Sequence, residues 1–190
     1  GDVTGDDLPD IVAASLTLGG VSLLPGTGAG AFGAKVDMAT GTNPRAVNLL
    51  DLTGDGTRDI VVANFGSNNV SVVENGATFT TGLLLARNDL TGLTGANRVT
   101  SGDVTQDGHV ELVVTSPAGF SGLTVLQGLG DGTFPLRKSA GGSNLGETAL
   151  EDLNGDGLVD LVSAGNSDLT VQLGTGGGHF ANPVTYPVNV

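Results

Sequence analysis

The stretch "DLTGDGTRD", Asp51–Asp59, decides the fold of this chain, because it recurs. It places carboxylates at its positions 1, 5 and 9 and a threonine at position 3. Three related stretches are "DVTGDDLPD" from Asp2, "DVTQDGHVE" from Asp103 and "DLNGDGLVD" from Asp152. The four starting positions lie 49, 52 and 49 residues apart. A period near fifty residues is typical of a four-stranded propeller blade.

Other segments recur with the same period. Each acidic loop runs into an apolar, β-branched segment that is expected to form a buried strand: 11–15, 60–64, 112–116 and 161–165. A second strand with alternating polarity is expected at 21–25, 70–74, 123–127 and 169–173. Less regular strands, such as 35–39 and 183–187, follow, and a last strand such as 46–50 leads into the next loop.

A glycine-rich turn that ends in phenylalanine also marks each unit. The turns are "GTGAGAF", "ENGATF", "GLGDGTF" and "GTGGGHF", and they end at Phe32, Phe79, Phe134 and Phe180. A bulky ring that recurs once per unit indicates packing between units. The chain is therefore predicted to be all-β, a β-propeller or part of one. Its four four-stranded blades would span about 1–40, 41–90, 91–140 and 141–190 in a single domain, with the first blade lacking a strand.

Composition excludes several classes of protein. The 190 residues include 33 glycines without a collagen period, and 38% are hydrophobic, which is too many for a disordered chain. The net charge of -13 repels phosphate backbones, so nucleic acid is not expected as a partner. No apolar run approaches the roughly 20 residues that span a bilayer. The absence of cysteine excludes disulfides and thiolate metal sites.

The acidic loops have the composition of a calcium site. Calcium prefers six to eight oxygen ligands, and a tight loop can supply side chains from positions 1, 3, 5 and 9 and a carbonyl from position 7. One ion in each loop, up to four in all, is predicted. The predicted ligands, with the position-7 residue of each loop acting through its carbonyl, are Asp2, Thr4, Asp6, Leu8, Asp10; Asp51, Thr53, Asp55, Thr57, Asp59; Asp103, Thr105, Asp107, His109, Glu111; Asp152, Asn154, Asp156, Leu158 and Asp160.

Two loops depart from the pattern. In the first, Asp7 replaces the turn glycine of position 6; in the third, Gln106 interrupts the G-D-G sequence and Glu111 replaces aspartate. The alternative interpretation is that aspartate and glycine serve here only as turn formers. Four copies in register, whose positions 1, 5 and 9 hold 12 of the 20 acidic residues, favour a metal. Magnesium suits these loops less well because it demands near-ideal octahedral geometry.

The pattern D-x-[TN]-G-D-G-x-x-D-[IL]-V, followed by G-x-G-x-G-x-F, resembles FG-GAP/VCBS repeats. These build the propellers of integrin alpha-chain heads and of many bacterial extracellular proteins. The resemblance implies that each unit is a blade, that calcium lies between its first two strands, and that partners bind at the opposite face. Family propellers commonly have seven blades. A fragment of a longer propeller, a four-bladed ring and closure by two chains therefore all remain open, and open blade edges favour self-association.

These features predict a calcium-stabilised scaffold that is secreted or on the cell surface, or periplasmic, and that binds a protein or a glycan. The alternatives are the propeller part of a polysaccharide-degrading enzyme and a lectin. Two histidines, His109 and His179, one tyrosine and no tryptophan make an enzyme site a poor fit, so the chain is not expected to be an enzyme. The aromatic content of 4% also disfavours a sugar-stacking site.

Overall fold

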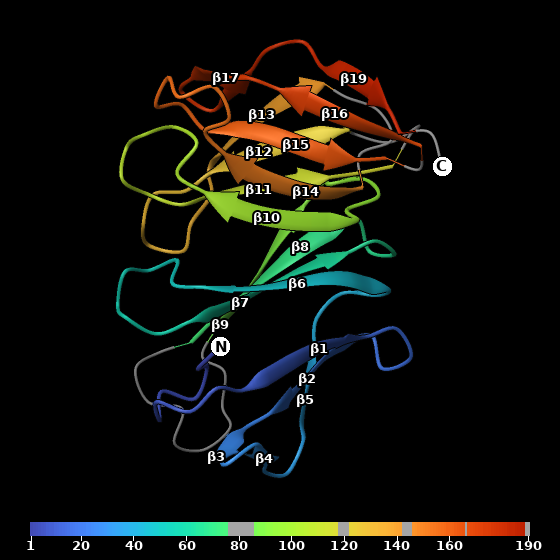
Figure 1. Ribbon diagram of the computed structural model, residues 1–190. Coiled ribbons are helices and arrows are strands. Elements are labelled where there is room, and N and C mark those ends of the chain that lie inside the picture. The colour runs from blue at the N-terminus through green and yellow to red at the C-terminus, as the bar shows by residue number, and fades with distance from the viewer. Residues whose placement is uncertain (76–85, 118–121, 142–145, 166, 189–190) are drawn as a thin grey trace. The chain divides into compact units, whose positions relative to one another are not determined.

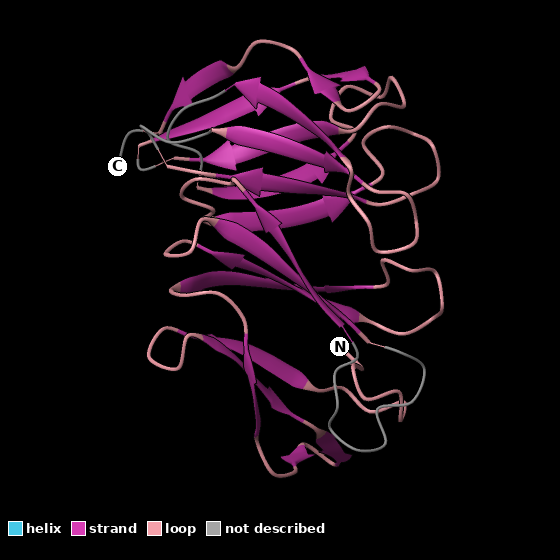
Figure 2. Cartoon of the chain, turned by 180° about the vertical axis from the view of Figure 1, so that it is seen from behind, coloured by secondary structure: helices cyan, strands magenta, loops and turns pink. Residues whose placement is uncertain are grey.

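A computed structural model describes residues 1–75, 86–117, 122–141, 146–165 and 167–188 (Figure 1). Within these ranges the chain is all-β, and Figure 2 shows strands and loops with no helix. None of the described segments is a helix of the length and hydropathy that a membrane crossing requires. The predicted fold class is confirmed.

Four sheets follow the four sequence repeats, and each is called a blade. Within each sheet, the strands lie side by side in the order in which they occur along the chain, and every pairing is antiparallel. Blade 1 has β1 (Ile11–Ser15), β2 (Gly20–Leu24) and β5 (Val36–Ala39). Blade 2 has β6 (Pro44–Leu50), β7 (Asp59–Asn64), β8 (Asn69–Glu74) and β9 (Ala86–Thr91). Blade 3 has β10 (Arg98–Gly102), β11 (Glu111–Thr115), β12 (Leu123–Gln127) and β13 (Leu136–Gly141). Blade 4 has β14 (Glu147–Glu151), β15 (Asp160–Ala164), β16 (Asp168–Gln172) and β19 (Val184–Pro187).

The glycine-rich turns contain short strands that the sequence does not predict. In blade 1, β3 (Gly26–Gly28) pairs with β4 (Ala31–Phe32); in blade 4, β17 (Gly174–Gly176) pairs with β18 (His179–Phe180). The repeated glycines hide this pairing because glycine is a poor strand former whose pattern indicates a turn. The predicted turn at Phe79 lies outside the described residues.

The chain divides into two compact units, Gly1–Gly92 and Leu93–Val190, which hold two blades each. In the first unit the core lies between blades 1 and 2, where Val21, Leu23, Ile60 and Val62 pack together. The core of the second unit lies between blades 3 and 4, and its members include Val113, Leu123, Val125, Leu161 and the partly buried Phe180. Phe180 therefore packs between two repeats, blades 3 and 4, as predicted, whereas Phe32 of blade 1 is 43% exposed and departs from that prediction.

The predicted burial of the first strand is wrong. All six residues of β7 are buried, whereas β1 is exposed or half-buried along its whole length. In blades 2 to 4 the equivalent strands, β7, β11 and β15, each pair with a strand on both edges, whereas β1 pairs with β2 along one edge. Among the described residues no strand pairs with the other edge of β1, which agrees with a first blade that lacks one strand.

Candidate metal centres in the acidic loops

The acidic loops occupy the same place in every blade. The loop from Asp51 connects β6 to β7, and the loops from Asp103 and Asp152 make the equivalent connections in blades 3 and 4. The loop from Asp2 leads into β1. The loops of blades 2 to 4 therefore connect the first two strands of their blades, which is the position that the resemblance implies for the loop.

The four loops share one backbone path. Positions 4 and 6 adopt left-handed conformations, for example Gly54 (φ 74°) and Gly56 (φ 87°). Asp7 and Gln106, which interrupt the glycine pattern, adopt the same conformation, each with φ 64°. The departures in sequence therefore leave the turn unchanged and place strain on two non-glycine residues.

This strain can be tested at Gln106. We expect Gln106→Gly to raise the free energy of unfolding by up to about 1 kcal/mol, because it relieves a left-handed non-glycine residue. The exposed hydrogen bond from the Gln106 side chain to the carbonyl of Gly157 is lost and offsets part of this gain. Gly108→Ala is the matched control: its φ is 87°, and an added Cβ would meet no atom within 4 Å. That change should lower the free energy of unfolding by about 1 kcal/mol, because alanine is strained at this positive φ while its side chain has room. Urea unfolding of both variants measures these two changes in the free energy of unfolding. A loss of stability in both variants would contradict the strain assigned to Gln106.

The carboxylates at positions 1 and 5 hold the turn together. Asp51 accepts hydrogen bonds from the amides of Gly54 (2.7 Å), Asp55 (3.2 Å) and Gly56 (2.8 Å). Asp55 accepts from the amide and the hydroxyl of Thr57, at 2.8 and 2.6 Å, and these bonds lower the pKa of Asp55. The equivalent acids of the other loops, Asp2, Asp6, Asp103, Asp107, Asp152 and Asp156, bond in the same way.

The carboxylate at position 9 is a buried clamp, a role that the sequence analysis missed. Asp59 is fully buried, and its two oxygens accept from the amides of Leu52 and Asn75, both at 2.8 Å. Burial raises the pKa of Asp59. Asp10 and Asp160 make equivalent pairs of bonds. For Asp10, burial opposes ionisation, but the amide bonds, led by that of Gly26, outweigh it and lower the pKa.

Position 3 carries the strongest indication of a missing partner. The hydroxyls of Thr4, Thr53 and Thr105 are buried and have no hydrogen-bond partner among the described residues. Each of these hydroxyls does lie near enough to a loop carboxylate to help lower its pKa: Thr4 to Asp10, Thr53 to Asp55 and Thr105 to Asp107. None of the three approaches has hydrogen-bond geometry. Buried hydroxyls of native proteins are nearly always bonded, so three unpartnered ones at one repeat position point to an absent group.

The third and fourth loops vary this arrangement. In the fourth, the Asn154 side chain is bonded to Asp156 through both its oxygen and its amide nitrogen. In the third, one oxygen of the fully buried Glu111 accepts from the amides of Val104 and Thr105, at 2.9 and 3.0 Å. The other Glu111 oxygen, Oε1, is buried and makes no bond with hydrogen-bond geometry. The amide of Gly128 lies near enough to the carboxylate to oppose the effect of burial, but burial dominates and raises the pKa of Glu111.

We expect Glu111→Gln to raise the free energy of unfolding by about 1 kcal/mol near pH 7 in EDTA, because an amide carries no buried charge. The folded-state pKa of Glu111 is raised, so its ionised form costs stability above that pKa. The cost vanishes once the pH falls below the ordinary pKa of glutamate, and the gain should approach zero near about pH 4. Urea unfolding at both pH values tests this; a gain that does not depend on pH would contradict it.

The predicted ligands of the four loops are chemically suited to a hard cation. All predicted ligand atoms are oxygens, and an ionised carboxylate has about four lone-pair sites, so the amide bonds leave it capacity for a further partner. The position-7 residues Leu8, Thr57, His109 and Leu158 are held by their amides, which donate to the position-5 carboxylates. Among the described residues, however, no three acidic or histidine side chains converge closely enough to hold a metal by themselves.

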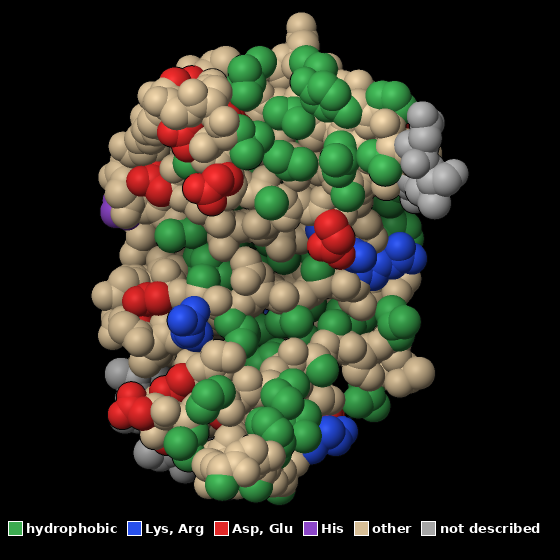
Figure 3. Space-filling view, in the orientation of Figure 1, with side chains coloured by type: hydrophobic (Ala, Val, Ile, Leu, Met, Phe, Trp, Pro, Cys, Tyr) green, Lys and Arg blue, Asp and Glu red, His purple; other side chains and the backbone are tan. Residues whose placement is uncertain are grey.

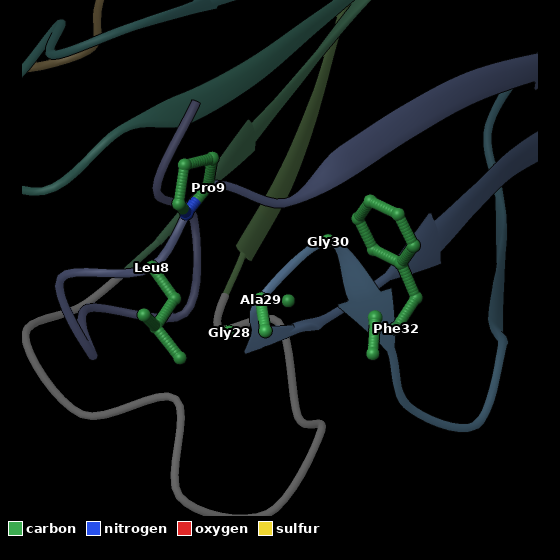
Figure 4. A pocket seen from close by; sticks show the side chains of 8 residues that line it. Leu8, Pro9, Gly28, Ala29, Gly30 and Phe32 are labelled. Atoms are coloured by element: carbon green, nitrogen blue, oxygen red, sulfur yellow. The ribbon is translucent and has the colours of Figure 1, made fainter.

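A small apolar pocket of about 240 Å³ lies beside the first loop (Figure 4). Leu8 and Pro9 of the loop line one side, and the β3–β4 hairpin from Gly26 to Phe32 lines the other. Phe32 is 43% exposed. The pocket therefore lies between the first acidic loop and the glycine-rich hairpin of the same blade.

Comparison with known families decides the identity of the repeats. A family model described as FG-GAP-like repeat matches the chain twice, over residues 2–62 and 51–114. The chain belongs to the FG-GAP-like repeat family. The two matches begin at successive acidic loops and each extends into the next repeat, so the FG-GAP-like unit coincides with the period of the loops. No curated protein matches this FG-GAP-like chain.

Two solved structures share the fold of the FG-GAP-like chain. A lectin of Agrocybe aegerita, described as recognising non-reducing terminal N-acetylglucosamine, has a TM-score of 0.65 and 24% identity, over 97% of this chain and 50% of the lectin. The V. cholerae biofilm matrix protein Bap1 has a TM-score of 0.58 and 20% identity, over 96% of this chain and 27% of Bap1. The chain thus spans half or less of the length of these proteins.

Proposed function

We propose that this chain is a calcium-stabilised FG-GAP-like scaffold that binds a protein or a glycan, with calcium in a structural role. The observation that carries the calcium proposal is the set of buried, unpartnered hydroxyls of Thr4, Thr53 and Thr105. Each belongs to a loop whose other predicted ligands are also oxygens, and the net charge of -13 favours cation binding. In each loop the predicted ligands would hold the ion, which would offset the repulsion between the loop carboxylates.

Calorimetric titration of the metal-free chain tests this proposal. We expect up to four calcium ions to bind, and magnesium to bind much more weakly because it keeps its waters. Thr53→Val removes the position-3 oxygen of the second loop at nearly constant shape, and it should remove or weaken one site. Thr133→Val is the control, since Thr133 lies outside the acidic loops. Absence of calcium binding by the folded chain would refute the proposal.

The proposed location is outside the cytosol. Calcium modules outside cells commonly bind at roughly 10⁻⁴–10⁻³ M, and such affinities suit millimolar calcium. A dissociation constant below about 10⁻⁷ M would instead be typical of an intracellular calcium protein and would count against this location.

The partner proposal draws on the neighbours of the same fold, a lectin that recognises N-acetylglucosamine and a biofilm matrix protein. A glycan array probed with the calcium-saturated chain separates the two partner classes. Binding to defined glycans that free sugar competes away favours the lectin alternative. Absence of glycan binding would leave a protein partner as the proposed ligand. The proposal assigns no catalysis to the chain.

A further inference from the structure

Within each unit, the later blade covers the acidic loop of the earlier blade. In the second unit, the β17–β18 hairpin of blade 4 lies against blade 3. The amide of Gly178 donates to the carbonyl of Val104 at 3.1 Å, and Lys138 donates to the carbonyl of Gly177. Phe180, at the end of this hairpin, packs against the core that contains Leu123 and Val125 of blade 3.

In the first unit a different donor from the later blade reaches the equivalent carbonyl. The side-chain amide of Asn75, which begins the glycine-rich turn of blade 2, donates to the carbonyl of Val3. Val3 and Val104 occupy the same position, the second, of their acidic loops. Their side chains are 0% and 5% exposed. Burial of the position-2 side chain thus accompanies cover by the next blade.

Blade 4 has the same surface, and no hairpin among the described residues covers it. Leu153, at position 2 of the fourth loop, is 50% exposed. Strand register places Leu169 of β16 where blade 3 has Leu123, and these leucines are 40% and 0% exposed. Hydrophobic side chains gather over this end of the second unit, where β16 and β19 lie (Figure 3). The end patch consists of the apolar residues Leu153, Val162, Leu169, Val171, Val184 and Tyr186.

Blade 1 carries a hairpin of the matching shape. The pairings Gly26 with Phe32 and Gly28 with Ala31 repeat the pairings of β17 with β18. The φ angles of residues 28, 29 and 30 are 85°, 52° and 76°, and those of residues 176, 177 and 178 are 85°, 58° and 74°. Phe32 is nevertheless 43% exposed beside the apolar pocket of Figure 4, whereas its counterpart Phe180 is packed in a core.

We propose that the β3–β4 hairpin of one copy of this chain docks on the end patch of a second copy, as the β17–β18 hairpin docks on blade 3. Phe32 then packs against Leu169, and the amide of Gly30, the counterpart of Gly178, donates to the carbonyl of Leu153. The two surfaces are different, so the contact is head-to-tail and generates a closed ring or an open-ended assembly. Copies with a charge of -13 repel one another, so added salt strengthens the association.

Sedimentation velocity on the full chain, with calcium present and over a wide concentration range, tests this proposal. The wild-type mass is expected to rise above the monomer value of 18.7 kDa as concentration and salt increase. Phe32→Asp disables the hairpin and Leu169→Asp disables the patch, and each variant should stay at the monomer mass. Leu16→Asp is the matched control: Leu16 is 65% exposed between β1 and β2, outside both surfaces, and this variant should associate like the wild type.

A mixture of the two disabled variants gives the sharpest readout. The Phe32→Asp copy retains a working patch and the Leu169→Asp copy retains a working hairpin, so together they should form a dimer and nothing larger. Far-ultraviolet circular dichroism of each variant checks that it is folded. A wild type that stays monomeric at all concentrations, as it would if another protein covers the patch, overturns the proposal. Association that survives both changes, or a mixture that remains monomeric, also overturns it.

Discussion

Asp59→Ala is expected to lower the free energy of unfolding by about 4 kcal/mol in EDTA. Asp59 is fully buried, and its loss leaves the amides of Leu52 and Asn75 without an acceptor. Each buried, unsatisfied donor costs about 1–3 kcal/mol. Asp59→Asn should cost less than half as much, because its amide oxygen can satisfy one of the two donors and because it removes a buried charge, whose burial raises the pKa of Asp59.

Asp55→Ala is the matched control. Asp55 is an exposed acid of the same loop, and its bonds to Thr57 are also exposed, so the expected loss is under about 1 kcal/mol. Urea unfolding of all three variants in EDTA separates the clamp from any effect of a cation. A loss at Asp59 no larger than that at Asp55 would show that the buried carboxylate is not a clamp.

Calcium is expected to raise the melting temperature of the metal-free chain by roughly 10–20 °C. A site that binds only the folded state adds about 2.7 kcal/mol when the free ion is at 100 times its dissociation constant. The two loops that match the pattern best begin at Asp51 and Asp152, one in each compact unit. Calcium binding is therefore expected to raise the free energy of unfolding of both units. For about 100 residues, 1 kcal/mol corresponds to roughly 4–8 °C.

Calorimetric melts in calcium, in magnesium and in EDTA measure this effect. Magnesium should give a much smaller rise than calcium. The double variant Asp51→Asn with Asp152→Asn retains an acceptor oxygen for each turn but loses the two charges, and it should lose most of the calcium response. A folded wild type whose melting temperature does not respond to calcium would leave the acidic loops as turns alone.

The sequence predicted the repeat, the fold class and most strands, because these depend on local pattern. The predicted strand 123–127 matches β12 residue for residue, and β1 matches 11–15. Apolar alternation and glycine-rich turns are properties of short segments, so they can be seen in a single sequence. The burial of β1 was mispredicted because burial depends on a neighbouring strand, which the pattern of β1 itself does not contain.

The loop chemistry was predicted less completely, for a physical reason. Spacing assigned Asp51 and Asp59 the same role, that of a ligand. The structure gives them different surroundings: Asp51 bonds exposed amides of its own turn, whereas Asp59 is buried and also reaches Asn75. That second contact spans 16 residues, and no local pattern indicates it. Glu111 has one methylene more than aspartate, and the missing hydrogen bond of its Oε1 can be interpreted only once the role of position 9 as a buried clamp is known.

The clamp also bears on how the chain folds. The two hydrogen bonds of Asp59 span only 7 and 16 residues, and strand pairing within each blade joins strands that are consecutive in their sheet. Contacts of short sequence separation require little loop-closure entropy before they form, so they favour rapid folding. Each blade can therefore nucleate separately and then support its neighbour, as repeat proteins do. A polypeptide emerging from the ribosome could complete one blade before the next has been synthesised.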